Sequence, residues 1–547
     1  MKVMTLISLI CLFFISCKQG IDKPVDSINA EKSPNILLIM ADDMGWTDLG
    51  CYGSEISTPN IDKLAIEGVM FTDFHTSVSC SPTRSMLLTG TDNHIAGLGN
   101  MEELLTKEQE GKPGYEGHLN DRVVTLAEVL KDGGYHTYMA GKWHLGAEPD
   151  YYPHVRGFER SFSMLDGGAS HWNDMAGIQA SKPVADYSKD GKTLQQLPKD
   201  HYSSKSFADF LIGAMREDHG DGKPFFTYFA LQAAHDPIHV PEPWLSKYQG
   251  QYDDGYETLK AERIASTKQL GLIPVDAPSS PFHKTTKEWN SFSKEDKAYE
   301  SRTMEAYAGL VDNMDYHIGR VINFLKDIGE YENTIIIFTV DNGPNPWYAD
   351  EYPSNAGSDF MKEFDNSLEN IGQPGSNVSY GLGWAQASAG PLDYFKFTVG
   401  EGGIRTPLLI TGKGIQNGVK NNTFAYVMDI MPTILDFAKI DHPETYQGRE
   451  VASMRGSSLV GVLTGKANNT HEEALGGEML NGKWMRKGNY KAVLIAKPWG
   501  PNEWKIYDVV NDPGETKDLS KQQSELLEEL RNAWDVYSTE VGVVLSE

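Results

Sequence analysis

Residues 35–41 form an almost unbroken apolar run that stops at two adjacent carboxylates, Asp42 and Asp43. A strand whose side chains are apolar on both sides has to be buried on both faces, as the strands of parallel sheets are. Further strand-like runs follow at residues 135–140, 225–231, 334–340 and 408–410. Predicted helices separate these runs. Strands that alternate with helices indicate an α/β fold with a large, mostly parallel sheet flanked by helices.

The predicted helices have recognisable ends and faces. Residues 59–67 begin with a proline in the first turn, and residues 123–131 end before a pair of glycines. Apolar residues between positions 306 and 325 recur on one helical face, and a further helix is predicted at residues 428–438. These helices are long enough to cover the predicted sheet.

The pattern changes near residue 440, where short strands and one long terminal helix at about 524–539 replace the earlier alternation. We therefore predict a large α/β domain at residues 35–440 and a smaller C-terminal α+β domain at 441–547. Three loop-rich stretches, at residues 146–222, 240–298 and 344–395, are expected to shape the mouth of a pocket.

Polar residues follow several predicted strands, and in sheets of this kind the active site lies beyond the carboxyl ends of the strands. Asp42 and Asp43 follow the first strand, and Asp341 and Asn342 follow the strand at 334–340. Oxygen ligands without a cysteine or histidine cluster suit calcium or magnesium better than zinc. The four residues predict one divalent metal site, with calcium as the expected ion and magnesium as the alternative.

Two further polar groups follow predicted strands. Lys142 and His144 come just after the strand at 135–140, and the alternation of side chains along a strand predicts that both face the same side. His235 follows the strand at 225–231. The same sheet edge is therefore expected to carry basic groups beside the carboxylates.

The first 34 residues have the pattern of an export signal followed by a tether. The apolar run at residues 3–15 is too short for a convincing membrane span. Residues 14–17 (Phe-Ile-Ser-Cys) resemble a bacterial lipobox, which predicts a signal peptide at residues 1–17 and a lipid on Cys17. Ordinary signal-peptidase cleavage nearby is the alternative. Residues 18–34 would be the tether of an exported lipoprotein, periplasmic or anchored to the outer membrane.

The charge of the chain restricts its partners. Asp and Glu number 76 against 49 Lys and Arg, a formal charge of −27. This balance argues against nucleic acid as a partner, because phosphate binding needs a basic face. An anionic substrate would need positive contacts concentrated in one pocket.

Residues 80–90 read Cys-Ser-Pro-Thr-Arg-Ser-Met-Leu-Leu-Thr-Gly, and residues 134–144 end in Gly-Lys-Trp-His. These segments resemble the two signature motifs of type I sulfatases. The segments at 157–162 and 383–387 resemble bacterial arylsulfatases in particular, and the similarity covers nearly all of the chain after residue 34. It implies the fold of alkaline phosphatase relatives, with a small four-stranded sheet at the C-terminus.

In that family the motif cysteine is oxidised by a formylglycine-generating maturation enzyme, and the hydrated aldehyde is the nucleophile. The resemblance therefore implies formylglycine at Cys80, which joins the predicted metal ligands. The catalytic residues implied in the same way are Arg84, Lys142, His144, His235 and Lys396. The implied reaction is hydrolysis of the sulfate monoester of a phenol or a sugar.

The resemblance also implies individual roles. Arg84 holds the orientation of the aldehyde, and Lys142 and Lys396 offset the negative charge of the sulfate. His235, together with Lys396, protonates the leaving oxygen. His144 removes a proton from the second hydroxyl, which releases sulfate.

The cysteine count supports this interpretation. Of Cys11, Cys17, Cys51 and Cys80, the first two lie in the predicted signal and lipidation site. With Cys80 converted to an aldehyde, no intramolecular disulfide is expected, and Cys51 is expected to be a buried small residue.

Two alternatives stay open on the sequence alone. One is formylglycine-dependent hydrolysis of phosphonates or phosphodiesters, whose tetrahedral anions are similar to sulfate. The other is an inactive lipoprotein that binds sulfated glycans, although a mere binder needs no proton donor such as His235. The loop at 167–172 is a candidate lining of a sugar site, while packing is the expected role of Trp172.

Overall fold

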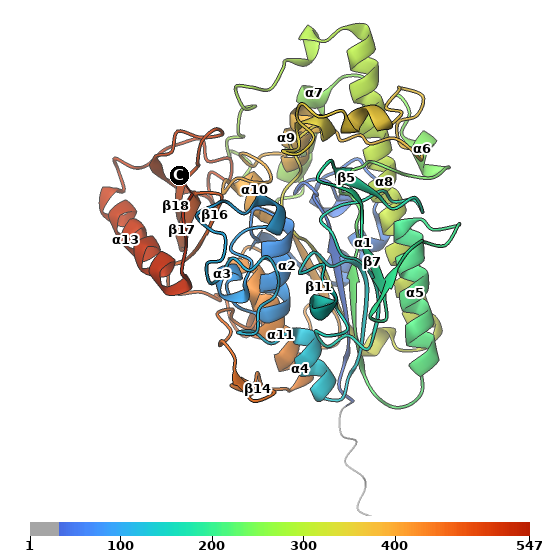
Figure 1. Cartoon of the computed structure of the whole chain (residues 1–547). Helices are drawn as coiled ribbons and strands as arrows, with labels where there is room; N and C mark the ends of the chain where they lie inside the picture. Colours follow the sequence, from blue (N-terminus) through green and yellow to red (C-terminus); the bar gives the residue numbers. More distant parts are fainter. Residues whose placement is uncertain (1–31, 547) are drawn as a thin grey trace, which may run out of the picture. The chain divides into compact units, whose positions relative to one another are not determined.

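Eleven strands of the described residues, 32–546, join into one sheet in the computed structural model (Figure 1). The strand order is β12-β2-β11-β10-β1-β9-β3-β4-β7-β8, and β13 pairs with β2. The parallel centre of the sheet consists of β10 (Thr334–Val340), β1 (Asn35–Ala41), β9 (Phe225–Ala230), β3 (His136–Lys142) and β4 (Arg160–Met164). The predicted mostly parallel sheet is confirmed at this centre.

Antiparallel strands extend the sheet on both sides. β11 (Arg405–Thr411) runs antiparallel to both β10 and β2 (Gly68–His75). The sequence analysis missed β2, because Thr72 and Asp73 interrupt its apolar run although all eight residues are buried. The remaining strands are short: β7 (Tyr187–Lys189), β8 (Lys192–Leu194), β12 (Val419–Asn421) and β13 (Ala425–Tyr426).

The side chains of β1 alternate between two hydrophobic cores. Leu37, Ile39 and Ala41 pack in one core with α1 (Pro59–Glu67), α5 (Ser203–Asp218) and α8 (Lys294–Asp327). Ile36, Leu38 and Met40 pack in the other with α2 (Cys80–Thr89), α4 (Leu126–Asp132) and α11 (Ile430–Ala438). Figure 1 shows these two groups of helices on opposite faces of the sheet. Burial of both faces explains why β1 is apolar throughout.

The predicted helix at 123–131 begins three residues later than expected. Thr125 forms a capping box with Glu128, so that α4 starts at Leu126. The three stretches described as loop-rich are only partly so, because they contain α5, α7 (Tyr256–Gln269) and α9 (Gly381–Ala389). The buried residues of α7 include Lys260 and Arg263, so its buried face was not visible as an apolar pattern.

The C-terminal region has the expected α+β structure. β16 (Leu475–Met479), β17 (Gly482–Lys487), β18 (Tyr490–Leu494) and β19 (Trp504–Asp508) form a separate antiparallel sheet. One face of this sheet packs against α13 (Ser524–Val541) through Leu530 and Trp534. Residues Ser33–Glu547 are nevertheless one compact unit, and the domain boundary at residue 440 stays a prediction.

Buried ion pairs join the small sheet to the rest of the protein. Arg486 of β17 makes two hydrogen bonds to Asp73 of β2, at 2.8 and 2.5 Å. The ring of His94 lies between two carboxylates, with Nδ1 2.9 Å from Asp92 and Nε2 3.2 Å from Glu478 of β16. Because these groups are buried, removal of one partner would leave an uncompensated charge.

Two smaller expectations can be compared with the structure. The expectation that Cys51 is buried is wrong, because Cys51 lies in a surface turn, η1 (Gly50–Tyr52), and is partly exposed. Trp172 packs against Tyr202 with ring centroids 4.9 Å apart, which agrees with its expected packing role.

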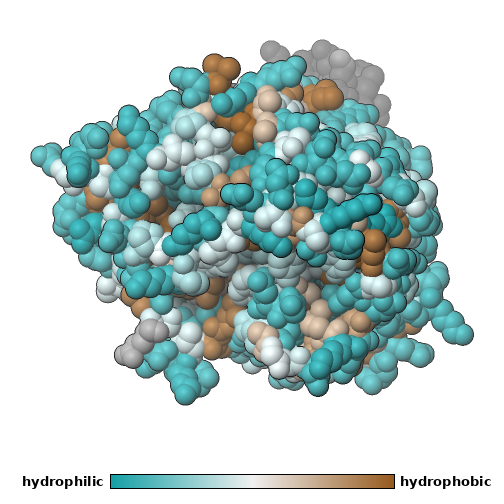
Figure 2. Space-filling model, turned by 90° about the horizontal axis from the view of Figure 1, so that it is seen from above, coloured by the Kyte–Doolittle hydropathy of each residue, from teal (hydrophilic) through white to brown (hydrophobic). Residues whose placement is uncertain are grey.

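No helix among residues 32–546 is long and apolar enough to cross a membrane. The predicted signal peptide, the lipidation site at Cys17 and most of the tether lie outside the described residues. Figure 2 shows a predominantly hydrophilic surface with scattered hydrophobic residues, as the formal charge of −27 leads one to expect.

His94 predicts a pH-dependent contribution to stability. Burial by itself lowers the pKa of His94, but Asp92 and Glu478 outweigh this effect and raise the pKa to about 9. The folded-state pKa is above the ordinary value of about 6.5, so the charged ring stabilises the fold fully below that pH. The contribution disappears as the pH rises to about 9. We expect the free energy of unfolding, measured with urea, to fall by up to ~3 kcal/mol across this window.

The variant His94→Gln should be less stable than the wild type at about pH 6 and should lose most of this pH dependence. His219→Gln, at an exposed position, is the matched control and should keep the wild-type profile. An unchanged pH dependence in His94→Gln would show that other groups cause it.

Candidate active site

The carboxyl ends of four adjacent strands bring most of the predicted site residues together. Ala41 and Val340 are paired in register at the ends of β1 and β10, so the segments that follow them are neighbours. The residues delivered there are Asp42 and Asp43 after β1, Asp341 and Asn342 after β10, Lys142 at the end of β3 and His235 after β9. The parallel order of the strands therefore places acids and bases at one edge.

Cys80 is the first residue of α2, a helix that follows β2. Its side chain is buried, with 2% of its surface exposed. Burial raises the pKa of the Cys80 thiol to about 12, although Lys142 and Lys396 act in the opposite direction. Because a helix N-terminus favours negative charge, this position suits an anionic group better than the neutral thiol present.

Arg84 lies one turn after Cys80 and is completely buried. Its Nε and Nη2 donate to Oδ2 of Asp341 at 3.1 and 2.8 Å, and its Nη1 donates to the carbonyl oxygen of Lys142 at 3.0 Å. Three directional hydrogen bonds hold the guanidinium in one orientation. Arg84 thus connects α2 with the ends of β10 and β3.

Two buried lysines are paired with the carboxylates after β1. Nζ of Lys142 is 2.7 Å from Oδ2 of Asp42, and Nζ of Lys396 donates to Oδ2 of Asp43 at 2.7 Å. Burial lowers the pKa of each ammonium group, but the adjacent carboxylates outweigh it and raise both pKa values. Both lysines therefore remain charged. The backbone N–H of Lys396 donates a hydrogen bond to the carbonyl oxygen of Pro344, which holds the loop that carries Lys396 beside the segment after β10.

The acids at this edge have the chemistry of a divalent metal site. Ligand atoms of Asp42, Asp43, Cys80 and His235 lie within 4.8 Å of one another. Oδ1 of Asp42 and Oδ1 of Asn342 are buried without a hydrogen-bond partner among the described residues. Such oxygens need a partner, because a buried polar atom without one is costly.

The charges around Asp42 also favour a bound cation. Burial, with a contribution from Asp341, raises the pKa of Asp42 to about 7, despite the nearby Lys142. A carboxylate in this position is short of positive charge, which a divalent cation supplies. The mostly oxygen donor set therefore fits calcium or magnesium. His235 joins the cluster, whereas the sequence analysis assigned it only a catalytic role.

The two predicted catalytic histidines have different hydrogen-bond partners but line one cavity. Nε2 of His235 is 3.4 Å from Oδ2 of Asp43, and its Nδ1 is 2.7 Å from the Asp236 carbonyl oxygen. His144 and Cys80 line the same small cavity, the Cys80 cavity, together with His235 and Lys396. The sequence analysis used the alternation of side chains along a strand to place His144 on the same side as Lys142. That reason is wrong, because β3 ends at Lys142 and the backbone of His144 has a positive φ of 54°.

A larger cavity opens beside the Cys80 cavity. It measures about 310 Å³ and shares Glu103, His144 and Gly167 with the Cys80 cavity. Carboxylate residues dominate its charged lining, so we name it the acidic cavity. Gly167 and Gly168 belong to the loop that was predicted to line a sugar site, and both line this cavity.

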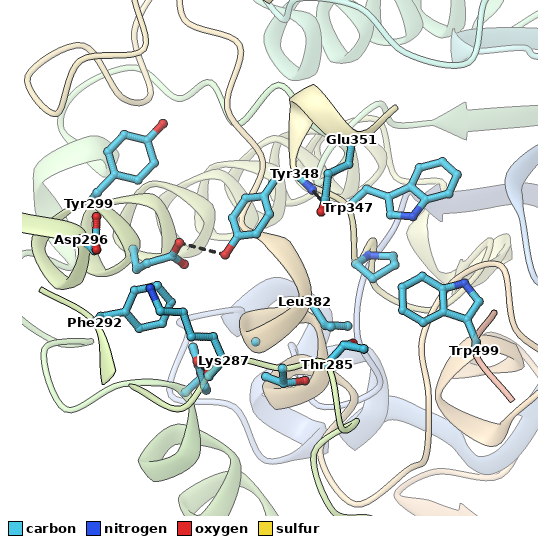
Figure 3. A pocket seen from close by; sticks show the side chains of 15 residues that line it. Thr285, Lys287, Phe292, Asp296, Tyr299, Trp347, Tyr348, Glu351, Leu382 and Trp499 are labelled. Carbon is cyan, nitrogen blue, oxygen red and sulfur yellow. Dashed lines mark hydrogen bonds between the residues drawn. The ribbon is translucent and has the colours of Figure 1, made fainter. Parts of the chain in front are cut away.

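A third cavity, of about 540 Å³, lies beyond Trp347 and is lined by aromatic residues that include Tyr348, Phe292 and Trp499 (Figure 3). We name it the aromatic cavity. Tyr348 donates a hydrogen bond of 2.9 Å to Glu300 across it. Trp347 also lines the Cys80 cavity, but none of the predicted site residues lines the aromatic cavity.

Sequence reasoning missed Glu103, which contacts His144. Its Oε1 is 3.0 Å from Nε2 of His144. Burial alone raises the pKa of Glu103, but His144 dominates and lowers it to about 2, so the carboxylate is charged. The residue belongs to a short 3-10 turn, η2 (Glu102–Leu104), far from any strand end or motif. No sequence signal marked it.

Comparisons with known proteins agree with the geometry. The sulfatase family model matches residues 34–440, and that of the N-sulphoglucosamine sulphohydrolase C-terminal region matches residues 393–536. An uncharacterized sulfatase of Schizosaccharomyces pombe is 43% identical over 526 residues, covering 94% of this chain and 95% of its own. An arylsulfatase of Klebsiella aerogenes is 39% identical over 449 residues, covering 82% of this chain and 95% of its own. The solved structure of Ps i-CgsB in complex with k-i-k-neocarrahexaose aligns over 93% of both chains, with a TM-score of 0.66 and 22% identity.

Glu103 is expected to position His144 for proton transfer. Glu103→Gln removes the charge that orients the ring, and loss of such an orienting partner typically costs about 10- to 100-fold. We expect kcat on a sulfate ester to fall by about 10-fold with a smaller change in KM. Glu103→Asp keeps the charge and should recover part of the loss. Full activity in Glu103→Gln together with a loss in Glu103→Asp would assign Glu103 a purely steric role.

Proposed function

The chain belongs to the sulfatase family, and we propose that it hydrolyses sulfate monoesters with formylglycine at position 80 as the nucleophile and one calcium ion as cofactor. Membership of the family makes it a sulfuric ester hydrolase with the alkaline-phosphatase-like fold. Formylglycine at position 80, the calcium ion and the roles of single side chains are proposed here beyond membership of the family.

The environment of Cys80 is the observation that carries this proposal. A buried thiol with a pKa of about 12 stays protonated at neutral pH and is a poor nucleophile. The residue nevertheless stands at a helix N-terminus with Arg84, Lys142 and Lys396 nearby. This surrounding of positive charge supports an oxygen nucleophile, which the hydrated aldehyde of formylglycine provides.

The first step transfers the sulfuryl group to residue 80. Hydrolysis is difficult because an oxygen nucleophile must approach an anionic centre, and the buried Arg84, Lys142 and Lys396 offset this repulsion. One hydroxyl of the hydrated aldehyde gives its proton to a carboxylate of the adjacent cluster and attacks sulfur, and the bond from sulfur to the leaving oxygen breaks. His235 protonates that oxygen, so that the alcohol or phenol departs neutral. Burial lowers the pKa of His235, while the carboxylates of Asp43 and Asp236 act in the opposite direction and favour the protonated ring.

The second step releases sulfate. His144 accepts the proton of the remaining hydroxyl on the same carbon, the bond from that carbon to the sulfate oxygen breaks, and the aldehyde is restored. Water then hydrates the aldehyde for the next cycle. A serine at this position would lack the second hydroxyl and would remain as a stable sulfate ester. This difference is the physical reason for the modification.

The residues that would hold the ion are Asp42, Asp43, residue 80, Asp341 and Asn342. When bound, a divalent cation supplies positive charge that polarises the hydroxyl of residue 80 and the sulfate oxygens. Asp42 and Asn342 offer the buried oxygens without partners described above. Arg84 holds the carboxylate of Asp341 in place. Calcium is proposed in preference to magnesium because the site is built almost entirely from protein oxygens.

The substrate class is proposed from the relatives. The Klebsiella aerogenes relative is an arylsulfatase, and Ps i-CgsB has been solved with a neocarrahexaose. We therefore propose an aryl sulfate or a sulfated sugar as substrate, after conversion of Cys80 by a formylglycine-generating enzyme. Export as a lipoprotein anchored through Cys17, in the periplasm or at the outer membrane, is proposed from the sequence pattern alone.

The aldehyde can be detected directly. We expect mass spectrometry of the Cys80 peptide, from active enzyme made in its native host, to show an aldehyde in place of the thiol. Cys80→Ala should reduce kcat on 4-nitrophenyl sulfate by at least about a thousandfold, because it removes the nucleophile. Its melting temperature should stay close to that of the wild type, since the smaller side chain is compatible with a helix.

Cys51→Ala is the matched control and should keep full turnover, because Cys51 lies in a surface turn away from the cluster. Active enzyme whose Cys80 remains a thiol would contradict the proposal. Faster hydrolysis of 4-nitrophenyl phenylphosphonate than of 4-nitrophenyl sulfate would instead favour the phosphonate alternative.

Calcium should bind and stabilise the folded protein. Removal of metal with a chelator leaves the buried carboxylates uncompensated, so the melting temperature should fall, and calcium at about 100 times its Kd should restore about 3 kcal/mol. Asp42→Asn should weaken this response, since it removes one charged ligand. A melting temperature that responds to neither chelator nor calcium would contradict the metal site.

A further inference from the structure

The charged groups of the acidic cavity are almost all negative. Its lining includes five carboxylates but a single lysine, Lys182, and one histidine, His144. The carboxylates are Glu102, Glu103, Glu148, Asp166 and Asp186. This composition contrasts with the buried cations Arg84, Lys142 and Lys396 near residue 80.

The cations of the acidic cavity are already paired. Nζ of Lys182 lies 2.5 Å from Asp166 and 2.8 Å from Asp186, and His144 faces Glu103. Within residues 32–546, no ion pair joins Glu102 or Glu148 to a cation. A molecule that enters the acidic cavity therefore meets uncompensated negative charge.

A second observation indicates that this cavity receives a ligand. Ser81 follows residue 80 directly and lines the acidic cavity although it is 99% buried, and its hydroxyl has no hydrogen-bond partner in the described part of the chain. A buried hydroxyl without a partner next to the nucleophile can form a hydrogen bond to the bound ester.

Two glycines in the wall of the cavity pack closely against the proposed catalytic histidines. A Cβ at Gly167 would lie 2.9 Å from the His144 ring, and a Cβ at Gly168 would lie 3.1 Å from the His235 ring. These gaps are too small for a side chain, so glycine at both positions allows the loop to hold the two rings in place.

We propose that the acidic cavity holds the alcohol or phenol part of the sulfate ester and selects esters whose organic part is positively charged, such as that of an amine, against those with a second anionic group. The inference deepens the proposed function and depends on it. The sulfate itself meets Arg84, Lys142 and Lys396, whereas the leaving group meets the carboxylates. A substrate with separated positive and negative ends matches this arrangement, because opposite charges attract more strongly in a partly buried cavity than in water.

Three phenol sulfates of similar size test the proposal: tyramine O-sulfate, tyrosol O-sulfate and 4-hydroxyphenylacetate O-sulfate, whose side chains are cationic, neutral and anionic. Saturated carbon separates each charge from the ring, so the leaving phenols have similar acidity. We expect kcat/KM to fall in that order, with a difference of about tenfold or more between the first and the last at low salt. The difference should shrink in ~0.5 M salt, because salt screens partly exposed charges.

The charges responsible can be removed without touching the proposed catalytic residues. Glu102→Gln combined with Glu148→Gln should reduce the ratio of kcat/KM between the cationic and anionic esters several-fold. Glu351→Gln is the matched control, because it removes a carboxylate from the aromatic cavity instead (Figure 3), and it should leave that ratio unchanged.

The outcomes separate the inference from the proposed function. Equal rates on the three esters, a preference for the anionic ester, or a ratio that responds to Glu351→Gln and not to the double variant would overturn the inference. Failure of enzyme that carries the aldehyde to hydrolyse even neutral tyrosol O-sulfate would instead contradict the proposed function.

Discussion

The structure depends on a set of buried charges that must be balanced at one edge of the central sheet. Asp42, Asp43 and Asp341 are each paired with a cation, at 2.7 to 2.8 Å, and the cations are Lys142, Lys396 and Arg84. A buried charge without its partner costs several kcal/mol. Because the partners come from β1, β10, β3, α2 and a distant loop, these elements have to assemble together for any of the pairs to be satisfied.

The same balance connects stability with catalysis. The cations that neutralise the acids are those that would meet the sulfate group, and Oδ1 of Asp42, which has no partner among the described residues, would bind the ion. The site therefore keeps polar atoms unsatisfied in the protein alone, a cost that proteins accept at functional sites. Outward from this centre the sign of the charge reverses, from the cations near residue 80 to the carboxylates of the acidic cavity.

Patterns of neighbouring residues in the sequence predicted the central strands of the sheet and the polar residues that follow them. Apolar runs buried on both faces identified β1 and β10 to the residue, and the polar residues after them marked the sheet edge. β2 was missed because Asp73 interrupts its run, although Arg486 from the small sheet compensates this charge. The face of α7 was missed because its buried residues are largely polar and find their partners in segments far away in sequence.

The sequence by itself determined the central buried strands, the motif residues from Cys80 to Arg84, and the acids and bases that follow the strands, because each depends on neighbours within a few positions. Only the tertiary structure decided which charges face each other, that Glu103 contacts His144, and that carboxylates from four separate segments surround one cavity. These features arise from pairs of residues up to several hundred positions apart. The pattern around either partner carries no information about the other until the sheet has brought them together.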